Sequence, residues 1–406
     1  MNERIATKDS VAAHASRRGL ARALLAWVAQ SFNDGGQDRA LALGPGDAGD
    51  HDLAHILDTG LAPLLHHAVR DRPGVVPGHW REVLTSAELT ARFAHQALRD
   101  SAADLIDVCR SAGVEVTLLK GISIADPCYP APHLRPMGDV DVLLSERDCA
   151  TVRSALLDLG YAPMEGWRDE GGEPHGAPLC DPRRRVWVEP HTALFHRDAR
   201  VNDSLLFTPA HLARSSVAST FDGRPVLRLS DELQLTYIAC YWLRDVSRNG
   251  VHPTYLIPLL DALLLLKASG RALDWDRLIG DLDNELAAAS LCVLLNEVRR
   301  FAFEDVLAPV IPRIAARQRI LGDLDLRVLH RIVDACLLEG RRFMGSVGAR
   351  HPMIERTVMD TLLVPGPFAR KLAALPWNLV FPPRDPERYS LRYHRMRVAR
   401  LLRGGR

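Results

Sequence analysis

Two aspartates separated by one residue, Asp139 and Asp141, begin 19 positions after Lys120 and limit the chemistry that this sequence can support. The segment from Asp139 to Leu144 is predicted to be a strand, and alternate side chains on a strand share a face. The two carboxylates therefore point the same way, with Cα atoms about 6.6 Å apart. Paired carboxylates suit Mg²⁺, which prefers oxygen ligands and shares its coordination with substrate phosphates. The pattern predicts a site for a divalent ion and a phosphate-bearing substrate.

The residues upstream of the aspartates fit the same interpretation. A strand is predicted over Val114 to Leu119, and it runs into a glycine turn and a helix start. Gly121 lets the backbone approach a phosphate, and Ser123 can bond the phosphate together with the free N–H groups of the helix start. Lys120 or Arg135 could offset the negative charge of such a substrate. Alternatively, Lys120 ends its strand in solvent and Arg135 pairs with one of the two aspartates.

Composition limits the class of protein. The chain has 406 residues, 47% of them hydrophobic, which is enough for two or three domains and a sizeable core. Its net charge of +1 shows no bias of the whole molecule toward nucleic acid or membranes. The seven cysteines are scattered without a CxxC pair, so no disulfide framework or zinc site is predicted. With no signal peptide and no apolar run long enough to span a bilayer, we expect a cytoplasmic protein with reduced, mostly buried thiols and no membrane partner.

Helical periodicity dominates outside the predicted strands. One amphipathic helix is predicted over Glu88 to Arg110, with an apolar face formed by Leu89, Phe93, Ala97, Ala102, Ile106 and Cys109. Another is predicted to start at Ser145, with Asp148 as capping partner and a buried stripe formed by Cys149, Val152, Leu156 and Leu159. A short strand is predicted over Val186 to Glu189 and is expected to stop at Pro190. After about residue 200 the chain is predicted to be largely helical.

These elements predict an α+β fold, in which a small mixed-sheet core is flanked by N- and C-terminal helical segments. The expected divisions are a helical region at residues 1–105, the core at 106–200, a helical domain at 201–376 and an Arg-rich tail at 377–406. Asp261 lies inside an apolar helix of the third region. We expect it to be a buried polar group that fixes the helical domain against the core.

The motifs resemble the nucleotidyltransferase superfamily that includes DNA polymerase beta. More closely they are similar to the bacterial family called uncharacterised nucleotidyltransferase, over about residues 50 to 300. The residues that carry the resemblance are Leu119-Lys120-Gly121, Tyr129, Arg135, Asp139-Val140-Asp141-Val142-Leu143 and Gly160-Tyr161. Family members continue with Asp-Leu-His on a later strand, where this chain has Glu189-Pro190-His191.

The resemblance implies an NTP-dependent enzyme that moves a nucleoside monophosphate, with AMP from ATP as the expected case, to an acceptor hydroxyl. Asp139 and Asp141 would bind Mg²⁺ or Mn²⁺ ions that bridge the triphosphate. Glu189 would be the third carboxylate, and its metal would lower the pKa of the acceptor hydroxyl. Two such ions about 3.5–4 Å apart stabilise both the attacking and the leaving oxygens. The acceptor stays open: a small hydroxyl compound, a peptide or protein side chain, or an RNA end.

Departures from the family pattern keep other functions open. Glu189 stands where Asp is usual, and a misplaced Glu189 would leave a nucleotide-binding module without turnover. His191 could bond Glu189 or the acceptor, or be a packed histidine. Eight arginines between Pro382 and Arg406 would favour a toxin-type enzyme acting on tRNA. The same tail could instead be solvated, or dock onto the protein through Tyr389, Leu391 and Tyr393.

Overall fold

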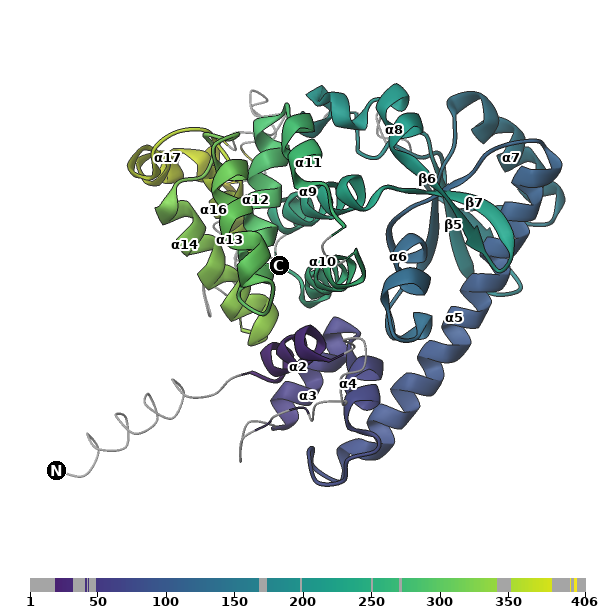
Figure 1. Ribbon diagram of the computed structural model, residues 1–406, viewed down its shortest axis with the longest axis horizontal. Coiled ribbons are helices and arrows are strands. Elements are labelled where there is room, and N and C mark those ends of the chain that lie inside the picture. The colour runs from purple at the N-terminus through teal and green to yellow at the C-terminus, as the bar shows by residue number, and fades with distance from the viewer. Residues whose placement is uncertain are drawn as a thin grey trace.

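A computed structural model of the chain describes residues 19–31, 41, 43, 49–167, 174–197, 199–249, 251–269, 272–341, 352–381, 395 and 398–399. Figure 1 shows a mixed sheet beside a helical region that contains the C-terminal helices, with a long helix, α5, joining the first helices to the sheet. The α+β prediction is confirmed. Most of the Arg-rich tail, including its two tyrosines and Leu391, lies outside the described residues.

The described N-terminal helices are α2 (Leu20–Gln30), α3 (Asp50–Thr59), α4 (Ala62–Val69) and α5 (Trp80–Ser111). The predicted apolar face of α5 is confirmed in its C-terminal half, where Ala102, Ile106 and Cys109 are buried. It is wrong in the N-terminal half, because Leu89 and Phe93 are 51% and 77% exposed. That half does not lie on the sheet and instead contacts α4 and a 3₁₀ turn, η1 (Pro132–Leu134).

The described strands form one seven-stranded sheet of order β3-β4-β5-β2-β1-β7-β6. Pairs β2–β5 and β1–β7 are parallel, and the other neighbours are antiparallel. The strands are β1 (Thr117–Leu118), β2 (Asp139–Leu143), β3 (Ala162–Pro163), β4 (Leu179–Asp181), β5 (Val186–His191), β6 (Ser216–Phe221) and β7 (Arg224–Leu229).

Strands β6 and β7 lie in a region that the sequence analysis predicted to be helical. They form a hairpin whose turn is Asp222-Gly223, and both turn residues have positive φ, +48° and +75°. Two-residue hairpin turns with Asp-Gly favour this geometry because it matches the twist of the strands. Strand β7 pairs with β1, so the sheet continues beyond residue 200.

The two faces of the sheet differ in chemistry. Val140, Val142 and Val188 are buried in an apolar core that includes residues of α5 and α7 (Glu146–Asp158). Ser145 caps α7 as predicted, since its Oγ accepts a hydrogen bond from the Asp148 N–H at 3.1 Å. Leu159 was expected in the buried stripe of α7, but it is the C-cap residue and is 52% exposed. The alternate residues of β2 and β5 point to the opposite face, next to α6 (Lys120–Cys128).

Helices after the hairpin pack into a second and larger core. They are α9 (Asp231–Asn249), α10 (Leu256–Ser269), α11 (Trp275–Asp281), α12 (Glu285–Arg299), α13 (Glu304–Ala315), α14 (Asp323–Ile332), α16 (Pro352–Leu362) and α17 (Phe368–Val380). A short helix, α8 (Pro209–Ser215), precedes the hairpin. Shorter helical turns are η2 (Arg200–Asp203), η3 (Leu205–Phe207), η4 (Pro253–Tyr255) and η5 (Val333–Leu338). Across the described ranges, no helix combines the length and apolar character needed to cross a bilayer. All seven cysteines are free and five of them are buried, as predicted.

Candidate functional site

Strands β2 and β5 place their acidic residues side by side. Asp141 lies opposite Glu189 in the parallel register, so both carboxylates stand on the same face. The prediction that Pro190 ends β5 is wrong, because the strand continues to His191. The His191 carbonyl accepts from the Leu144 N–H on the β2 side, so the backbone of Pro190, one residue earlier, faces the other side. There the ladder with β4 ends at Val188 and Leu179, and an isolated bridge joins His191 to His175. Pro190 thus lies between the regular β4–β5 ladder and that bridge, where proline is tolerated.

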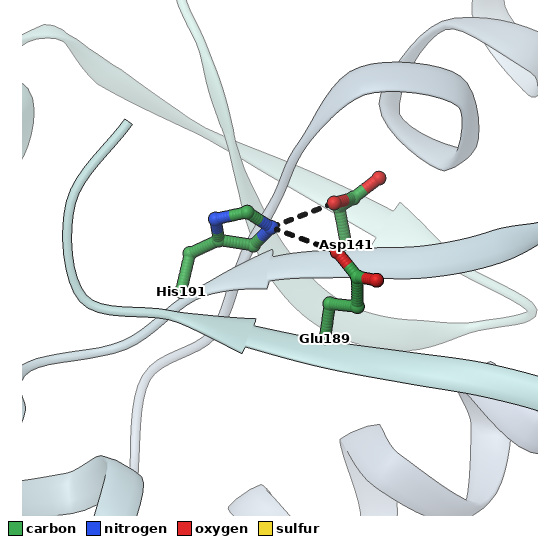
Figure 2. Close-up of side chains that lie close together, drawn as sticks. All are labelled: Asp141, Glu189 and His191. Atoms are coloured by element: carbon green, nitrogen blue, oxygen red, sulfur yellow. Dashed lines mark hydrogen bonds and ion pairs between the residues drawn. The ribbon is translucent and has the colours of Figure 1, made fainter. Parts of the chain in front are cut away.

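The side chains of Asp141, Glu189 and His191 converge (Figure 2). Ligand atoms of Asp141, Glu189 and His191 all lie within 4.8 Å of one another. His191 Nε2 is 2.7 Å from Asp141 Oδ1 and 3.7 Å from Glu189 Oε2. Two carboxylates and one imidazole form a donor set that fits a divalent ion. Of the predicted metal ligands, the structure thus brings Asp141 and Glu189 together, and it adds His191.

The His191 ring is buried, and its surroundings act on its pKa in opposite directions. Burial lowers the pKa of His191, and the Asp141 carboxylate partly offsets this effect. With a neutral ring, the short contact to Asp141 requires the proton on Nε2, which donates to the carboxylate. Nδ1 is buried and has no hydrogen-bond partner within the part of the chain that the structure describes. Binding of a metal by Nε2 would move the ring proton to Nδ1.

Lys120 supplies the positive charge of the site. Its ammonium is 2.6 Å from Asp141 Oδ1, the oxygen that also accepts from His191. Burial would raise the pKa of Asp141, but Lys120 and His191 outweigh it and hold that pKa well below its usual range. Burial likewise disfavours the charged form of Lys120, yet the neighbouring Asp141 raises the lysine pKa. Lys120 has a φ of +46°, a left-handed conformation that is uncommon for a side-chain-bearing residue.

Asp139 stands on the same face of β2, two residues before Asp141, but outside the three-residue group. Burial and the negative charge of Asp141 raise the pKa of Asp139 to about 7. Its electrostatic neighbours also include Lys120 and Glu189. The carboxylates are thus close enough to repel one another, which a bound cation would relieve.

Gly121 and Ser123 occupy the first turns of α6, where the backbone leaves β1. A Cβ on Gly121 would overlap Arg135 Nη1 and lie 2.7 Å from Met137 Sδ, so the glycine is required by packing against those side chains. Ser123 is buried and its Oγ donates to Gln234 Oε1 of α9 at 3.2 Å. Neither observation tests a phosphate contact, and both roles stay predictions.

Arg135 is bound within the protein. Its Nε and Nη2 donate to the two oxygens of Asp261 at 3.0 and 2.8 Å, and its Nη1 donates to the Pro136 carbonyl at 3.1 Å. Tyr129 Oη donates to the same carboxylate at 2.7 Å. The partner is therefore Asp261 of α10, and not either of the strand aspartates. The expectation that Asp261 fixes the helical region against the core is confirmed.

Two residues near the acids gave no signal in the sequence. His175 Nδ1 bonds the Gly176 carbonyl at 2.8 Å, while its Nε2 is 3.7 Å from Glu189 Oε2. Its ring lies edge-on to His191 with centroids 4.9 Å apart. Tyr237 of α9 is buried, and its pKa is raised to about 12 by burial. Both residues reach the site through long-range packing, which a local pattern does not report.

The family model for uncharacterised nucleotidyltransferases matches residues 51–300, a span that holds every residue of this site. The chain belongs to that family. The matched span contains β2 and β5, and it also includes α5 and α10. No curated protein and no solved structure matches the chain.

Proposed function

We propose that this nucleotidyltransferase moves AMP from ATP to an acceptor hydroxyl with a divalent metal, in the manner of the superfamily that includes DNA polymerase beta. One observation carries the proposal: two carboxylates and an imidazole from adjacent parallel strands converge within 4.8 Å. Exposed acidic clusters are common without a metal. Here, however, Asp141 and His191 are both about 2% exposed, so this group is buried and does not belong to an exposed acidic cluster.

The residues present fit a metal. Asp141, Glu189 and His191 would hold one ion, and Asp139 with Asp141 would hold a second beside the triphosphate. When bound, the ions supply charge neutralisation for the phosphates and a lower pKa for the acceptor hydroxyl. Mg²⁺ prefers oxygen ligands, whereas imidazole suits transition metals. The mixed donor set therefore favours Mn²⁺ over Mg²⁺ at the site that includes His191.

The protein's own groups would do the rest of the work. Lys120 would turn from Asp141 toward the phosphates once the carboxylate binds a cation, and it would then stabilise the charge on the leaving pyrophosphate. The start of α6 offers free backbone N–H groups near Gly121 for the triphosphate. Glu189 and His191 would keep the acceptor hydroxyl in line with the bond that breaks.

The test is the Asp139→Asn/Asp141→Asn double variant, with Asp158→Asn as a matched control at an exposed position of α7. Mn²⁺ binding is measured by calorimetry, and transfer is measured with α-labelled NTPs in cell extract followed by mass analysis of the labelled product. We expect the double variant to lose metal binding and transfer by at least a hundredfold, with a wild-type circular dichroism spectrum. Full turnover in that variant would show that the assignment is wrong. ATP binding by the wild type without pyrophosphate release would instead favour a nucleotide-binding module.

A further inference from the structure

The Glu189 carboxylate faces two imidazole rings, and only one of them has a role in the function proposed above. Glu189 Oε2 is 3.7 Å from His191 Nε2 and also 3.7 Å from His175 Nε2. A hydrogen bond would bring such a nitrogen and oxygen to about 2.7–3.2 Å, so neither contact is one. The side chains of His175 and Glu189 are 15% and 18% exposed, so a group from solvent can reach both.

The tautomer of His175 is fixed by its backbone neighbour. His175 Nδ1 lies 2.8 Å from the Gly176 carbonyl oxygen, which can only accept a hydrogen bond. Nδ1 therefore carries the proton, and Nε2 of the uncharged ring presents a lone pair to Glu189. A lone pair and a carboxylate oxygen repel each other unless a cation lies between them. Metal-binding imidazoles have this arrangement, because their other nitrogen donates to a carbonyl or a carboxylate.

The backbone on both sides of His175 is anchored. The Pro174 carbonyl accepts hydrogen bonds from the N–H and the Oγ1 of Thr192, at 2.7 and 3.2 Å. An isolated bridge joins His175 itself to the end of β5. On the other side, Arg153 Nη1 of α7 donates to the Ala177 carbonyl at 2.5 Å. These contacts hold His175 in place before any ion binds, as a preorganised ligand requires.

The spacing of these groups fits one ion. Ligand atoms about 2.1 Å from an ion lie at most about 4.2 Å apart, and both 3.7 Å separations at Glu189 fall below that limit. The two rings lie edge-on with centroids 4.9 Å apart, so they do not stack on each other. His175 is outside the group of three that includes Asp141, and its contact with the acids is through Glu189.

We propose that His175 is a further ligand of the ion held by Glu189 and His191, and that its nitrogen makes this position selective for a transition-metal ion over Mg²⁺. Imidazole suits transition metals, whereas Mg²⁺ prefers oxygen ligands. Asp139 and Asp141 supply only oxygen, so the ion beside the triphosphate keeps a preference for Mg²⁺. This role of His175 rests on the metal dependence in the proposed function, and it is independent of the nucleotide and of the acceptor.

Calorimetry with Mn²⁺ and with Mg²⁺, in the absence of nucleotide, measures what His175 contributes to affinity. We expect His175→Ala to bind Mn²⁺ about tenfold more weakly than the wild type. His175→Gln replaces the ring nitrogen by an amide oxygen, so the preference for Mn²⁺ over Mg²⁺ should fall about tenfold while Mg²⁺ affinity stays within about twofold. His211→Ala, at a half-buried position of α8, is the matched control and should bind both ions as the wild type does.

Pulsed electron paramagnetic resonance of the Mn²⁺-loaded protein, with isotope-labelled histidine, distinguishes a ligand from a neighbour. A bound imidazole couples its nitrogen to the electron spin of the metal, whereas a ring that only balances the charge of Glu189 does not. We expect couplings from two histidines in the wild type, and from one histidine in His175→Ala and in His191→Ala. If circular dichroism shows that His175→Ala does not fold, His175→Gln gives the same count.

Unchanged couplings and affinity in His175→Ala would overturn the ligand role and leave a metal-dependent transferase in place. Weaker Mn²⁺ binding with the wild-type number of couplings would also overturn it, because His175 would then act on Glu189 without touching the ion. A wild type that binds neither Mn²⁺ nor Mg²⁺ would remove the metal from the proposed function, and the role of His175 with it.

Discussion

Asp261→Asn is the substitution that best tests how the helical region is joined to the sheet. Asp261 is fully buried and accepts three hydrogen bonds, two from Arg135 and one from Tyr129. The Arg135 side chain is itself only 9% exposed. Asparagine keeps the volume but removes the negative charge, so the guanidinium stays buried without its counter-charge.

The burial of Arg135 and Asp261 sets the size of the expected loss in unfolding free energy. Removing one partner of a buried ion pair costs about 3–5 kcal/mol, because the other charge is left uncompensated. Replacing both partners by apolar residues of similar volume is close to neutral, so Arg135→Met/Asp261→Leu should unfold near the wild-type midpoint. Tyr129→Phe removes a single hydrogen bond to a charged group and should cost about 1.5–3 kcal/mol.

Urea unfolding followed by circular dichroism gives the free energies, and Arg135→Met, Asp261→Leu and their double variant form a cycle. A loss below about 1 kcal/mol for Asp261→Asn would refute the buried pair, since that is the value of an exposed pair. The double variant also tests the predicted phosphate role of Arg135. Because all three guanidinium nitrogens already bond within the protein, we expect ATP affinity to stay within threefold. A stable double variant with much weaker ATP binding would show that Arg135 contacts phosphate.

Three further substitutions test separate contacts. Burial would raise the pKa of Glu88, but its hydrogen-bonding partners His66 and Arg92 lower that pKa to about 2. The ionised carboxylate therefore contributes about 2 kcal/mol to the free energy of unfolding above pH 5, and this contribution is lost as the pH falls toward 2. Glu88→Gln should flatten the unfolding free energy across that pH range. Gly121→Ala should cost about 1–3 kcal/mol in urea unfolding by overpacking, whereas Gly78→Ala, whose added Cβ would meet no atom within 4 Å, should stay within about 0.5 kcal/mol. Lys120→Met removes the ammonium that competes with a metal ion for Asp141. Mn²⁺ affinity, measured by calorimetry, should therefore rise about tenfold while turnover falls. Unchanged metal affinity would contradict this competition.

Local patterns predicted the site's strands better than its surroundings. The spacing of Asp139 and Asp141 was sufficient to place both on one face, because a strand has a period of two. The Asp222-Gly223 turn was a visible hairpin signal, and the sequence analysis overlooked it. The exposure of Phe93 could not be predicted, because it depends on α5 extending past the sheet that its other half covers.

Long-range pairing explains the rest of what the sequence did not reveal. Arg135 and Asp261 are 126 positions apart, and each alone is compatible with several partners. The alignment of Asp141 with Glu189 depends on the register of two parallel strands, which no turn links directly. Pro190 was expected to end β5 because proline interrupts ladders, but the strand beside it ends first. A rule about one residue failed because the neighbouring strand was unknown.

The charge arrangement around Asp141 favours a functional site over a structural ion pair. A structural pair would need one cation for one carboxylate, and Lys120 already fulfils that need for Asp141. Yet Asp139 lies close enough to be electrostatically coupled, and Glu189 stands on the adjacent strand. Lys120 therefore faces more negative charge than it can neutralise, from a backbone conformation that costs energy. A fold that needed only stability would gain by replacing one of these acids, since like charges at short range repel. The excess negative charge is explained if the site is completed by a cation from outside the chain.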